Sequence, residues 1–282
     1  MIAIGKARGA AWLITCIGLI GCVSPAPDVS GDKTPTSIPI KVLKPEGPGP
    51  FPAVVILHDC SGLGPRSSGS PARWAKEPLR QGYVILIPDS FTTRGHADGV
   101  CTNPSPSRNE VSPARRVRDA QEALSYARAL PYVDGAHVGV MGASHGGSTT
   151  LATMVDPGSG FAAATALYPG CGVRYGDWRP GTAGAYKPVA PLLILTGELD
   201  DWTPAEPCRL LAERSRQAGY PVAIRIYSGA HHAYDSDRPV RYVETRVNMN
   251  APGGRGATTG GNPEAWADSI REVTAFFGKH LR

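Results

Sequence analysis

The sequence predicts an α/β fold, in which a mostly parallel β-sheet carries helices on both of its faces. The chain contains short, continuous apolar runs such as Ala53–Leu57 and Tyr83–Ile87, which are typical of strands buried on both faces. Stretches with helical spacing separate these runs from one another. The length of 282 residues, 41% of them hydrophobic, suits one large domain of this kind.

The predicted elements begin near residue 37 and continue to the end of the chain. An alternating segment predicts a half-exposed first strand at 38–43, and further strands are predicted at 53–57, 83–87, 137–141, 162–168, 192–196 and 222–227. Helices are predicted at 72–81, 113–130, 146–155, 204–219 and 263–281. Strands separated by helices of this length favour parallel pairing. No internal repeat or domain boundary interrupts the pattern, so residues 37–282 are expected to form one domain.

The N-terminus has the pattern of an export signal. Lys6 and Arg8 precede an apolar run over 10–20, which ends at Leu19-Ile20-Gly21-Cys22. This end resembles the lipobox of bacterial lipoproteins, in which the Cys, here Cys22, is lipid-modified and becomes the new N-terminus. We therefore expect a signal peptide over 1–21 and a flexible tether rich in Pro, Ser and Asp over 22–36. The alternative is an ordinary secretory signal, with Cys22 incidental.

Both interpretations of the N-terminus place the domain outside the cytoplasm. With lipidation, the domain would be held on a membrane, either on the periplasmic side or at the cell surface. The formal net charge is +5, but no basic cluster with interleaved aromatic residues is present, which argues against a nucleic-acid partner.

The domain contains four cysteines, Cys60, Cys101, Cys171 and Cys208. An even number in an exported protein favours disulfides, although four cysteines allow three pairings and free buried thiols are the alternative. No CxxC pair is present, so a zinc site is not expected.

The segment Gly142-Ala143-Ser144-His145-Gly146 matches the nucleophile-elbow pattern G-x-S-x-G. The pattern alone is weak evidence in a chain this rich in glycine. Its setting strengthens it, because an apolar strand precedes it and a helix follows it. Such a turn exposes the Ser144 hydroxyl above the sheet edge and places a helix N-terminus beside a developing oxyanion. The alternative is a glycine-rich turn with an incidental serine.

A serine nucleophile needs a base and an orienting carboxylate, and both residue types follow in the expected order. The strand at 192–196 runs into adjacent acids, Asp200 and Asp201. The strand at 222–227 is followed by two histidines, His231 and His232. The residues alone leave the choice within each pair open.

The chain resembles the dienelactone hydrolase family of α/β hydrolases over nearly the whole exported domain. The resemblance rests on the segments 54–62, 142–146, 197–204 and 227–234. It implies an α/β-hydrolase fold, Asp200 as the acid four residues before Pro204, and His232 as the base before a small and an aromatic residue. Asp201 and His231 stay as alternatives.

One oxyanion donor is expected from the backbone N–H after the nucleophile, at His145. The resemblance implies that the backbone N–H of Cys60 is the second. The Cys60 side chain could then form a disulfide with Cys101, and Cys171 could pair with Cys208 at the rim of the site.

The chain departs from dienelactone hydrolases proper in two ways. Those enzymes have Cys where Ser144 stands, and arginines grip their acidic substrate. Arg94 is a candidate for such an arginine, although an ordinary surface role is at least as consistent with the sequence. The activity of those enzymes is therefore not carried over by name.

Asp235–Asn262 does not fit the alternation of strands and helices. It is glycine-rich, weakly periodic and long for a loop. Its position directly after the histidine pair allows a rim or lid over the site, but a solvated excursion is the preferred interpretation. Trp202 and Tyr234 could form pocket wall or core.

The expected function is a serine hydrolase that cleaves a small-molecule ester or lactone through an acyl-enzyme. This chemistry needs no cofactor or metal. One alternative is a peptidase or amidase of the same fold, and another is a surface lipoprotein that binds without cleaving. The sequence does not indicate the oligomeric state.

Overall fold

The computed structural model describes Met1 and residues 37–103 and 110–282. Apart from Met1, the predicted signal peptide lies outside the described residues, as do Cys22 and the whole of the predicted tether. The main sheet has seven strands in the order β1-β3-β2-β4-β5-β6-β7. The bounds of these strands are β1 Ile40–Leu43, β2 Phe51–Leu57, β3 Val84–Pro88, β4 Val133–Ala143, β5 Ala163–Leu167, β6 Leu192–Gly197 and β7 Val222–Tyr227. Only β1 pairs antiparallel in this sheet.

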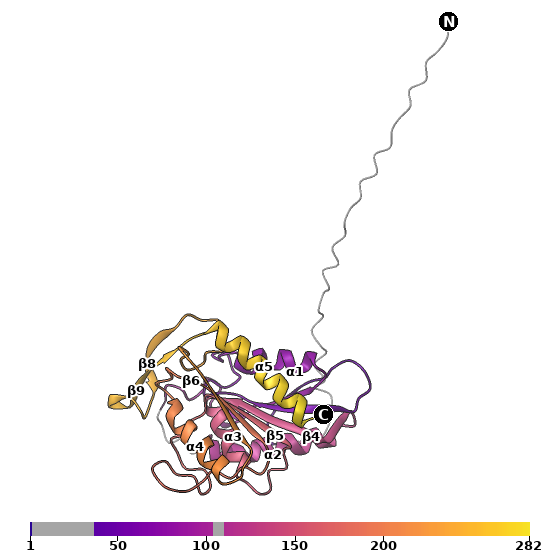
Figure 1. Ribbon diagram of the computed structural model, residues 1–282. Helices are drawn as coiled ribbons and strands as arrows, with labels where there is room; N and C mark the ends of the chain where they lie inside the picture. Colours follow the sequence, from indigo (N-terminus) through magenta and orange to yellow (C-terminus); the bar gives the residue numbers. More distant parts are fainter. Residues whose placement is uncertain (2–36, 104–109) are drawn as a thin grey trace.

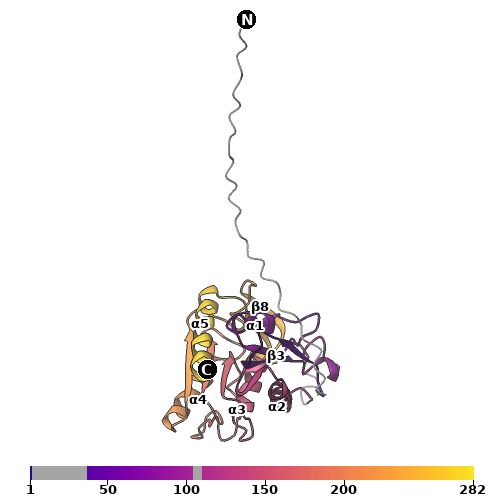
Figure 2. The same cartoon turned by 90° about the vertical axis from the view of Figure 1, so that its right-hand side faces the viewer.

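Five helices cover the two faces of the sheet (Figures 1 and 2). Their bounds are α1 Ser70–Arg80, α2 Pro113–Ala129, α3 His145–Met154, α4 Ala205–Gln217 and α5 Pro263–His280. Residues of α2, α3 and α4 pack with Val55 and Leu57 in one core cluster. Residues of α1 and α5 pack with Val54 and Ile56 in the other. Neighbouring residues of β2 thus point to opposite faces, as the continuous apolar run predicted.

The carboxyl ends of the parallel strands meet at one edge of the sheet. The loops that leave β2, β4, β6 and β7 there lead to Cys60, Ser144, Asp200 and His232. Ligands of open parallel sheets generally bind at this edge. The topology therefore brings together residues that are far apart in the chain.

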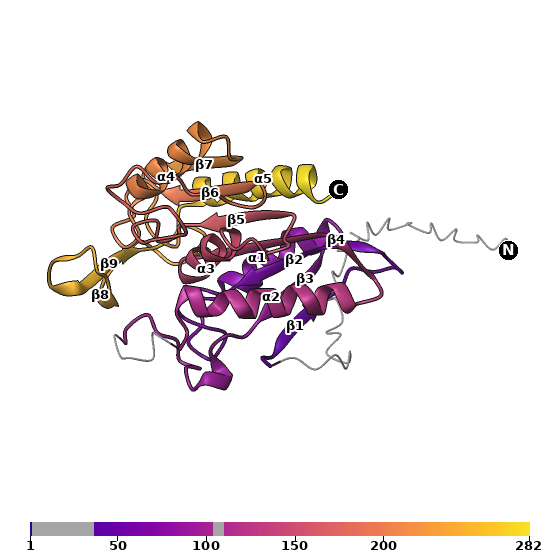
Figure 3. The same cartoon turned by 90° about the horizontal axis from the view of Figure 1, so that it is seen from below.

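A two-stranded hairpin, formed by β8 (Arg241–Val247) and β9 (Arg255–Thr259), extends beyond that edge (Figures 1 and 3). The base of the hairpin is closed, because Thr259 forms a bridge with His232 and the N–H of Gly260 donates to the carbonyl of His232 over 3.1 Å. The segment 235–262, for which a solvated excursion was the preferred interpretation, therefore contains an ordered hairpin whose first strand is largely exposed.

The predicted α/β architecture is confirmed, and each predicted strand and helix is present with ends shifted by a few residues. The structure contains the disulfides Cys60–Cys101 and Cys171–Cys208, the pairing that the sequence analysis favoured. Within the described residues, no helix is long and apolar enough to span a membrane. The same residues contain no cluster of three or more His, Cys, Asp or Glu side chains able to hold a metal ion.

Candidate active site

Ser144 lies on a sharp turn between the end of β4 and the start of α3. Its backbone has φ 53° and ψ −114°, in a region that a residue with a side chain rarely occupies. The strain is held by the surroundings, because the N–H of Ser144 donates to the carbonyl of Leu167 on β5 over 2.9 Å. The serine is 7% exposed. The turn therefore presents the hydroxyl in a fixed direction.

Glycines on both sides of Ser144 allow the turn to be this tight. A Cβ on Gly142 would lie 2.4 Å from backbone atoms of Gly146, and a Cβ on Gly146 would lie 2.1 Å from the carbonyl oxygen of Leu57. Real Cβ atoms do not approach backbone so closely. The G-x-S-x-G pattern thus has a steric origin here, since the start of α3 passes directly over the end of β2.

A chain of hydrogen bonds joins Ser144, His232 and Asp200. His232 Nε2 lies 2.9 Å from Ser144 Oγ, and His232 Nδ1 lies 2.8 Å from Asp200 Oδ2. The histidine is 2% exposed and the aspartate is 4% exposed. This order of donors and acceptors fits a hydroxyl, a base and a carboxylate that orients the base.

The neighbours in the two residue pairs have other contacts. Asp201 accepts hydrogen bonds from the backbone N–H and the hydroxyl of Thr258 on β9, each over 2.8 Å. His231 Nδ1 lies 3.0 Å from the carbonyl oxygen of Leu199. Of the four candidates, only Asp200 and His232 take part in the chain of hydrogen bonds that reaches Ser144.

Thr203 joins this chain and was not singled out from the sequence. Its hydroxyl donates either to Asp200 Oδ2, 2.9 Å away, or to the carbonyl of Tyr168, 3.0 Å away, and it also lies 3.0 Å from His232 Nδ1. Asp200 Oδ1 accepts the backbone N–H groups of Trp202 and Thr203. The signal available in the sequence is an aspartate followed by a hydroxyl residue three positions later, the spacing at which Asp caps a turn.

Aromatic side chains hold the His232 ring in place. Tyr168 packs edge-on against it, with 4.8 Å between ring centroids, and Trp202 lies tilted at 4.7 Å. The Tyr168 hydroxyl donates to the buried carboxylate of Asp235, which also accepts hydrogen bonds from Ser70 and Trp74. Trp202 lines the pocket, whereas Tyr234 is fully buried in the core.

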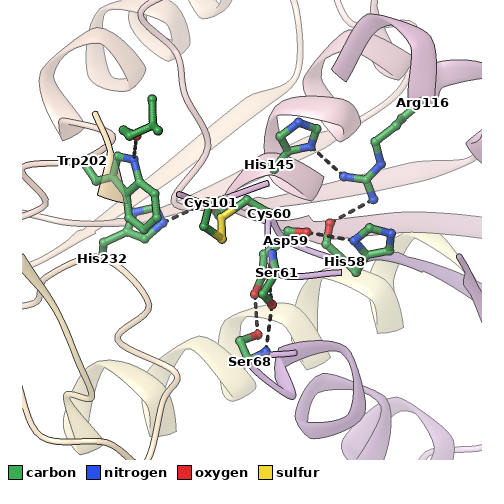
Figure 4. Close-up of a disulfide and its surroundings, with 12 residues drawn as sticks. His58, Asp59, Cys60, Ser61, Ser68, Cys101, Arg116, His145, Trp202 and His232 are labelled. Atoms are coloured by element: carbon green, nitrogen blue, oxygen red, sulfur yellow. Dashed lines mark hydrogen bonds between the residues drawn. A yellow bond between two sulfur atoms is a disulfide. The ribbon is translucent and has the colours of Figure 1, made fainter. Parts of the chain in front are cut away.

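The two residues expected to supply oxyanion donors both border the cleft beside Ser144. His145 directly follows the serine as the first residue of α3, and Cys60 lies after the end of β2. The disulfide from Cys60 to Cys101 fixes the second of these segments (Figure 4). The carbonyl of Cys101 in turn accepts the N–H of Val247 on β8 over 2.9 Å. The Cys60 loop is therefore linked to the hairpin.

One side of the cleft is strongly basic. Four arginines line it, together with Ser144, His232 and two acids, Asp59 and Asp235. The arginines are Arg73, Arg238, Arg241 and Arg246. Arg73 lies 3.7 Å from Asp235, whereas the other three form no salt bridge with any described residue. Three of the four come from the segment 235–262, which thus forms a rim of the site.

Arg246 is the most enclosed of the three unpaired arginines. Its guanidinium lies over the Trp202 ring, 5.4 Å from the centroid, and its Nε is buried without a hydrogen-bond partner among the described residues. Burial lowers the pKa of Arg246, and the nearby charges of Arg241 and Arg238 lower it further, against an opposing effect of Asp59. The side chain therefore has unused capacity to bind an anion.

The other side of the cleft is largely apolar. It is bordered by Ser144 and His145 and by the side chains of Val100, Pro113, Trp202, Val247 and Met249. Met249 is 79% exposed and lies in the turn of the β8–β9 hairpin. The serine thus sits between a basic side and an apolar side, and Trp202 borders both.

The sequence pattern of the Dienelactone hydrolase family matches residues 38–281. The chain belongs to this family. A Synechocystis protein provisionally named carboxymethylenebutenolidase is 25% identical over 257 residues, which cover 85% of this chain and 90% of that protein. Membership of the family makes the protein an ester hydrolase.

Solved structures share the fold. A Klebsiella pneumoniae protein with the provisional name dienelactone hydrolase has a TM-score of 0.62 at 20% identity, over 86% of this chain and 93% of its own. The apo form of Thermogutta terrifontis esterase 2 has a TM-score of 0.58 at 22% identity, over 90% and 94%. The α/β-hydrolase fold is therefore confirmed.

Arg94, the arginine suggested as a substrate contact for a member of this family, has a different position. Its guanidinium binds both carboxylate oxygens of Asp119 on α2, each over 2.7 Å, and it does not line the cleft. The arginines that do line the basic side were missed, because most of them belong to the segment whose periodicity was too weak to predict strands.

Proposed function

We propose that the protein is a serine hydrolase that cleaves a carboxylic ester or lactone through an acyl-enzyme. The observation that carries this proposal is the chain of hydrogen bonds from Ser144 Oγ through His232 to Asp200, built on a strained elbow at the carboxyl edge of the sheet. The proposed nucleophile is the hydroxyl of Ser144, which stands where dienelactone hydrolases proper have the thiol of a cysteine.

In the proposed reaction, His232 Nε2 takes the proton of Ser144 as the oxygen attacks the carbonyl carbon. Asp200 orients the imidazole and stabilises its positive charge. The backbone N–H groups of His145 and Cys60 stabilise the oxyanion. His232 then protonates the leaving oxygen, and water attacks the acyl-enzyme with His232 again acting as base.

The charges of the cleft favour an anionic small-molecule substrate. Arg238, Arg241 and Arg246 lie on its basic side without acidic partners among the described residues. A carboxylate is the group that a guanidinium binds best, through paired N–H donors. The provisional name of the Synechocystis relative specifies a lactone that bears a carboxyl group, which agrees with this substrate class.

We further propose that the domain acts outside the cytoplasm, as a lipoprotein tethered through Cys22. The support is the leader pattern of residues 1–22 together with two disulfides, which persist in oxidising compartments. In cells that express the full chain, the wild type should fractionate with membranes and Cys22→Ser should not. Equal fractionation of both forms would remove the anchor from the proposal.

The catalytic proposal is tested with a fluorophosphonate probe and mass spectrometry of the labelled peptide. Labelling should occur at Ser144 and be lost in Ser144→Ala, whose ester hydrolysis should fall by several orders of magnitude while its melting temperature is retained. Comparing p-nitrophenyl esters with aminoacyl amides then defines the bond that is cleaved. Undiminished hydrolysis by Ser144→Ala would refute the assignment.

A further inference from the structure

A buried arginine binds next to both residues expected to supply the oxyanion donors. Arg116 belongs to the first turns of α2, and its side chain is 0% exposed. It is among the largest fully buried side chains of the protein. Figure 4 shows its guanidinium between His145 and the backbone of the His58–Cys60 segment.

The guanidinium of Arg116 binds both segments that carry the proposed oxyanion donors. One terminal nitrogen donates to His145 Nδ1 over 2.7 Å, and the other donates to the carbonyl of His58 over 2.9 Å. The guanidinium lies over the Phe91 ring, with its carbon 5.1 Å from the ring centroid. A single rigid fork thus sets the spacing between α3 and the loop after β2.

The charge of Arg116 is not neutralised by a contacting carboxylate. Its hydrogen-bond partners are an imidazole and a carbonyl, and its Nε is buried without a partner among the described residues. The neighbouring Asp119 uses both oxygens to bind Arg94. Burial lowers the pKa of Arg116 to about 10, which leaves it cationic at neutral pH.

Holding an unpaired cation inside a protein is unfavourable by several kcal/mol. Where the role is purely structural, packed apolar side chains of similar volume often give the fold more stability than buried charges do. The same positive charge becomes favourable when negative charge develops nearby in a site that excludes water. The two donors held by Arg116 are the ones that would face that developing charge.

We propose that Arg116 is a positioning residue for oxyanion stabilisation, which fixes the His145 and Cys60 amides relative to each other and supplies a buried positive charge behind them. The inference rests on the proposed function, since it assigns the oxyanion to these two amides. Arg116 does not touch the substrate. It acts through His145 and the His58 carbonyl.

Arg128 provides a matched control on the same helix. Its guanidinium also makes two hydrogen bonds, in this case to the backbone carbonyls of Gly135 and Gly160, but at the opposite end of α2 and on the surface. Removing it deletes comparable hydrogen bonds without touching the segments that border Ser144. Any effect common to both arginines is therefore structural.

The test compares Arg116→Gln, Arg116→Lys and Arg128→Gln in the full-length protein. We expect kcat for a p-nitrophenyl ester to fall about tenfold or more in both Arg116 variants, with KM within about twofold, because the interaction strengthens only in the transition state. Arg116→Lys keeps a charge but not the fork, so it should fold and still lose kcat. Arg128→Gln should keep both constants.

A trifluoromethyl ketone inhibitor measures the oxyanion directly, because addition of the Ser144 oxygen converts its carbonyl into a tetrahedral oxyanion. Its Ki should rise in the Arg116 variants by the same factor by which kcat/KM falls. In addition, Arg116→Gln should lower kcat less in a His145→Leu background than in the wild type, since part of its effect passes through that imidazole.

Loss of thermal stability in the Arg116 variants with unchanged kcat and Ki would overturn the inference. A rise in KM alone, or equal effects in Arg128→Gln, would do so as well. These outcomes leave the nucleophile assignment intact, because that depends on whether Ser144→Ala is inactive. If Ser144→Ala is active, the proposed function itself fails.

Discussion

Asp201 binds Thr258 through two hydrogen bonds, one from the backbone N–H and one from the hydroxyl, each 2.8 Å long. Asp201 follows the proposed catalytic acid directly, and Thr258 lies on the hairpin that bears Arg241 and Arg246. The two adjacent aspartates therefore have different partners: Asp200 binds His232, and Asp201 binds the β8–β9 hairpin.

This division predicts different kinetic signatures for the two aspartates. Asp200→Ala should lower kcat by roughly 10³-fold or more, because His232 loses its orienting carboxylate. Asp201→Ala should loosen the hairpin and raise KM for an anionic ester several-fold, while kcat for a neutral ester changes little. Steady-state kinetics on one ester of each kind decides. The reverse pattern would make Asp201 the catalytic acid.

The Thr203 hydroxyl should help to orient the side chains of Asp200 and His232. Thr203→Val keeps the shape of the side chain but removes the hydroxyl that lies within reach of Asp200 and His232. We expect kcat to fall about tenfold, which corresponds to about 1.4 kcal/mol, while Thr203→Ser restores most of it. If the serine variant were as slow as the valine variant, packing rather than the hydroxyl would explain the loss.

Arg246 should determine preference for anionic substrates. The substrates 4-acetoxybenzoate and 4-acetoxybenzamide contain the same acetyl ester and differ mainly in charge. In Arg246→Met, kcat/KM for the anion should fall roughly tenfold relative to the amide, since a charge-assisted hydrogen bond is lost. The control is Arg255→Met, because Arg255 lies on β9 but binds the carbonyls of Thr102 and Thr245 instead. An unchanged ratio in Arg246→Met would refute the anion site.

The two disulfides should differ in their effect on catalysis. They close loops of similar length, with sequence separations of 41 and 37, so removing either should cost about 4 kcal/mol of stability in the chain-entropy description. Only Cys60–Cys101 holds a segment with a proposed oxyanion donor. Replacing Cys60 and Cys101 by serine should lower kcat even at temperatures at which the variant is still folded. Replacing Cys171 and Cys208 by serine should lower only the melting temperature. Equal kcat losses would contradict this.

Two buried histidines should make the fold sensitive to acid. Burial, aided by the charge of Arg116, holds the pKa of His58 and of His145 well below the usual 6.5. Below pH 6.5 these histidines are protonated in the unfolded chain but stay neutral in the folded protein. The free energy of unfolding therefore falls as pH falls, by about 1.4 kcal/mol per pH unit for each histidine.

His58→Gln should remove one of these contributions. His58 Nδ1 lies 2.8 Å from the carbonyl of Asp59, and its Nε2 accepts the N–H of Ser90, so a second ring proton would face a donor. Urea denaturation at pH 7.5 and 5.5 should show a smaller loss of stability for the variant than for the wild type. Identical losses would show that His58 does not contribute.

The elements of the main sheet could be predicted because burial on both faces produces unbroken apolar runs, such as 53–57 and 192–196. The hairpin could not, since β8 and β9 are mostly exposed and contain arginines, threonines and glycines in place of an apolar pattern. Its strands are specified by pairing with each other and by contacts such as Asp201 to Thr258, which no local pattern reveals.

The order of serine, acid and histidine could be predicted for a similar reason, because parallel strands bring their carboxyl ends together. The supporting residues could not. Thr203 and Arg116 look like ordinary loop and helix residues, and their importance arises from three-dimensional neighbours 29 positions away in the chain. Arg116 in particular lies on a helix whose arginines are otherwise typical of a solvated surface.

The β8–β9 hairpin is closed at its base by the bridge between Thr259 and His232, while the sheet and the proton relay are complete without its strands. The proposed catalytic residues and most arginines of the basic side thus lie in different stretches of the chain, which the hydrogen bond from Val247 to Cys101 connects. Mutations between residues 236 and 258 can remodel the charge of the rim without repacking either core. Directed evolution confined to this stretch should therefore shift the range of esters accepted while the hydrogen bonds among Ser144, His232 and Asp200 are preserved.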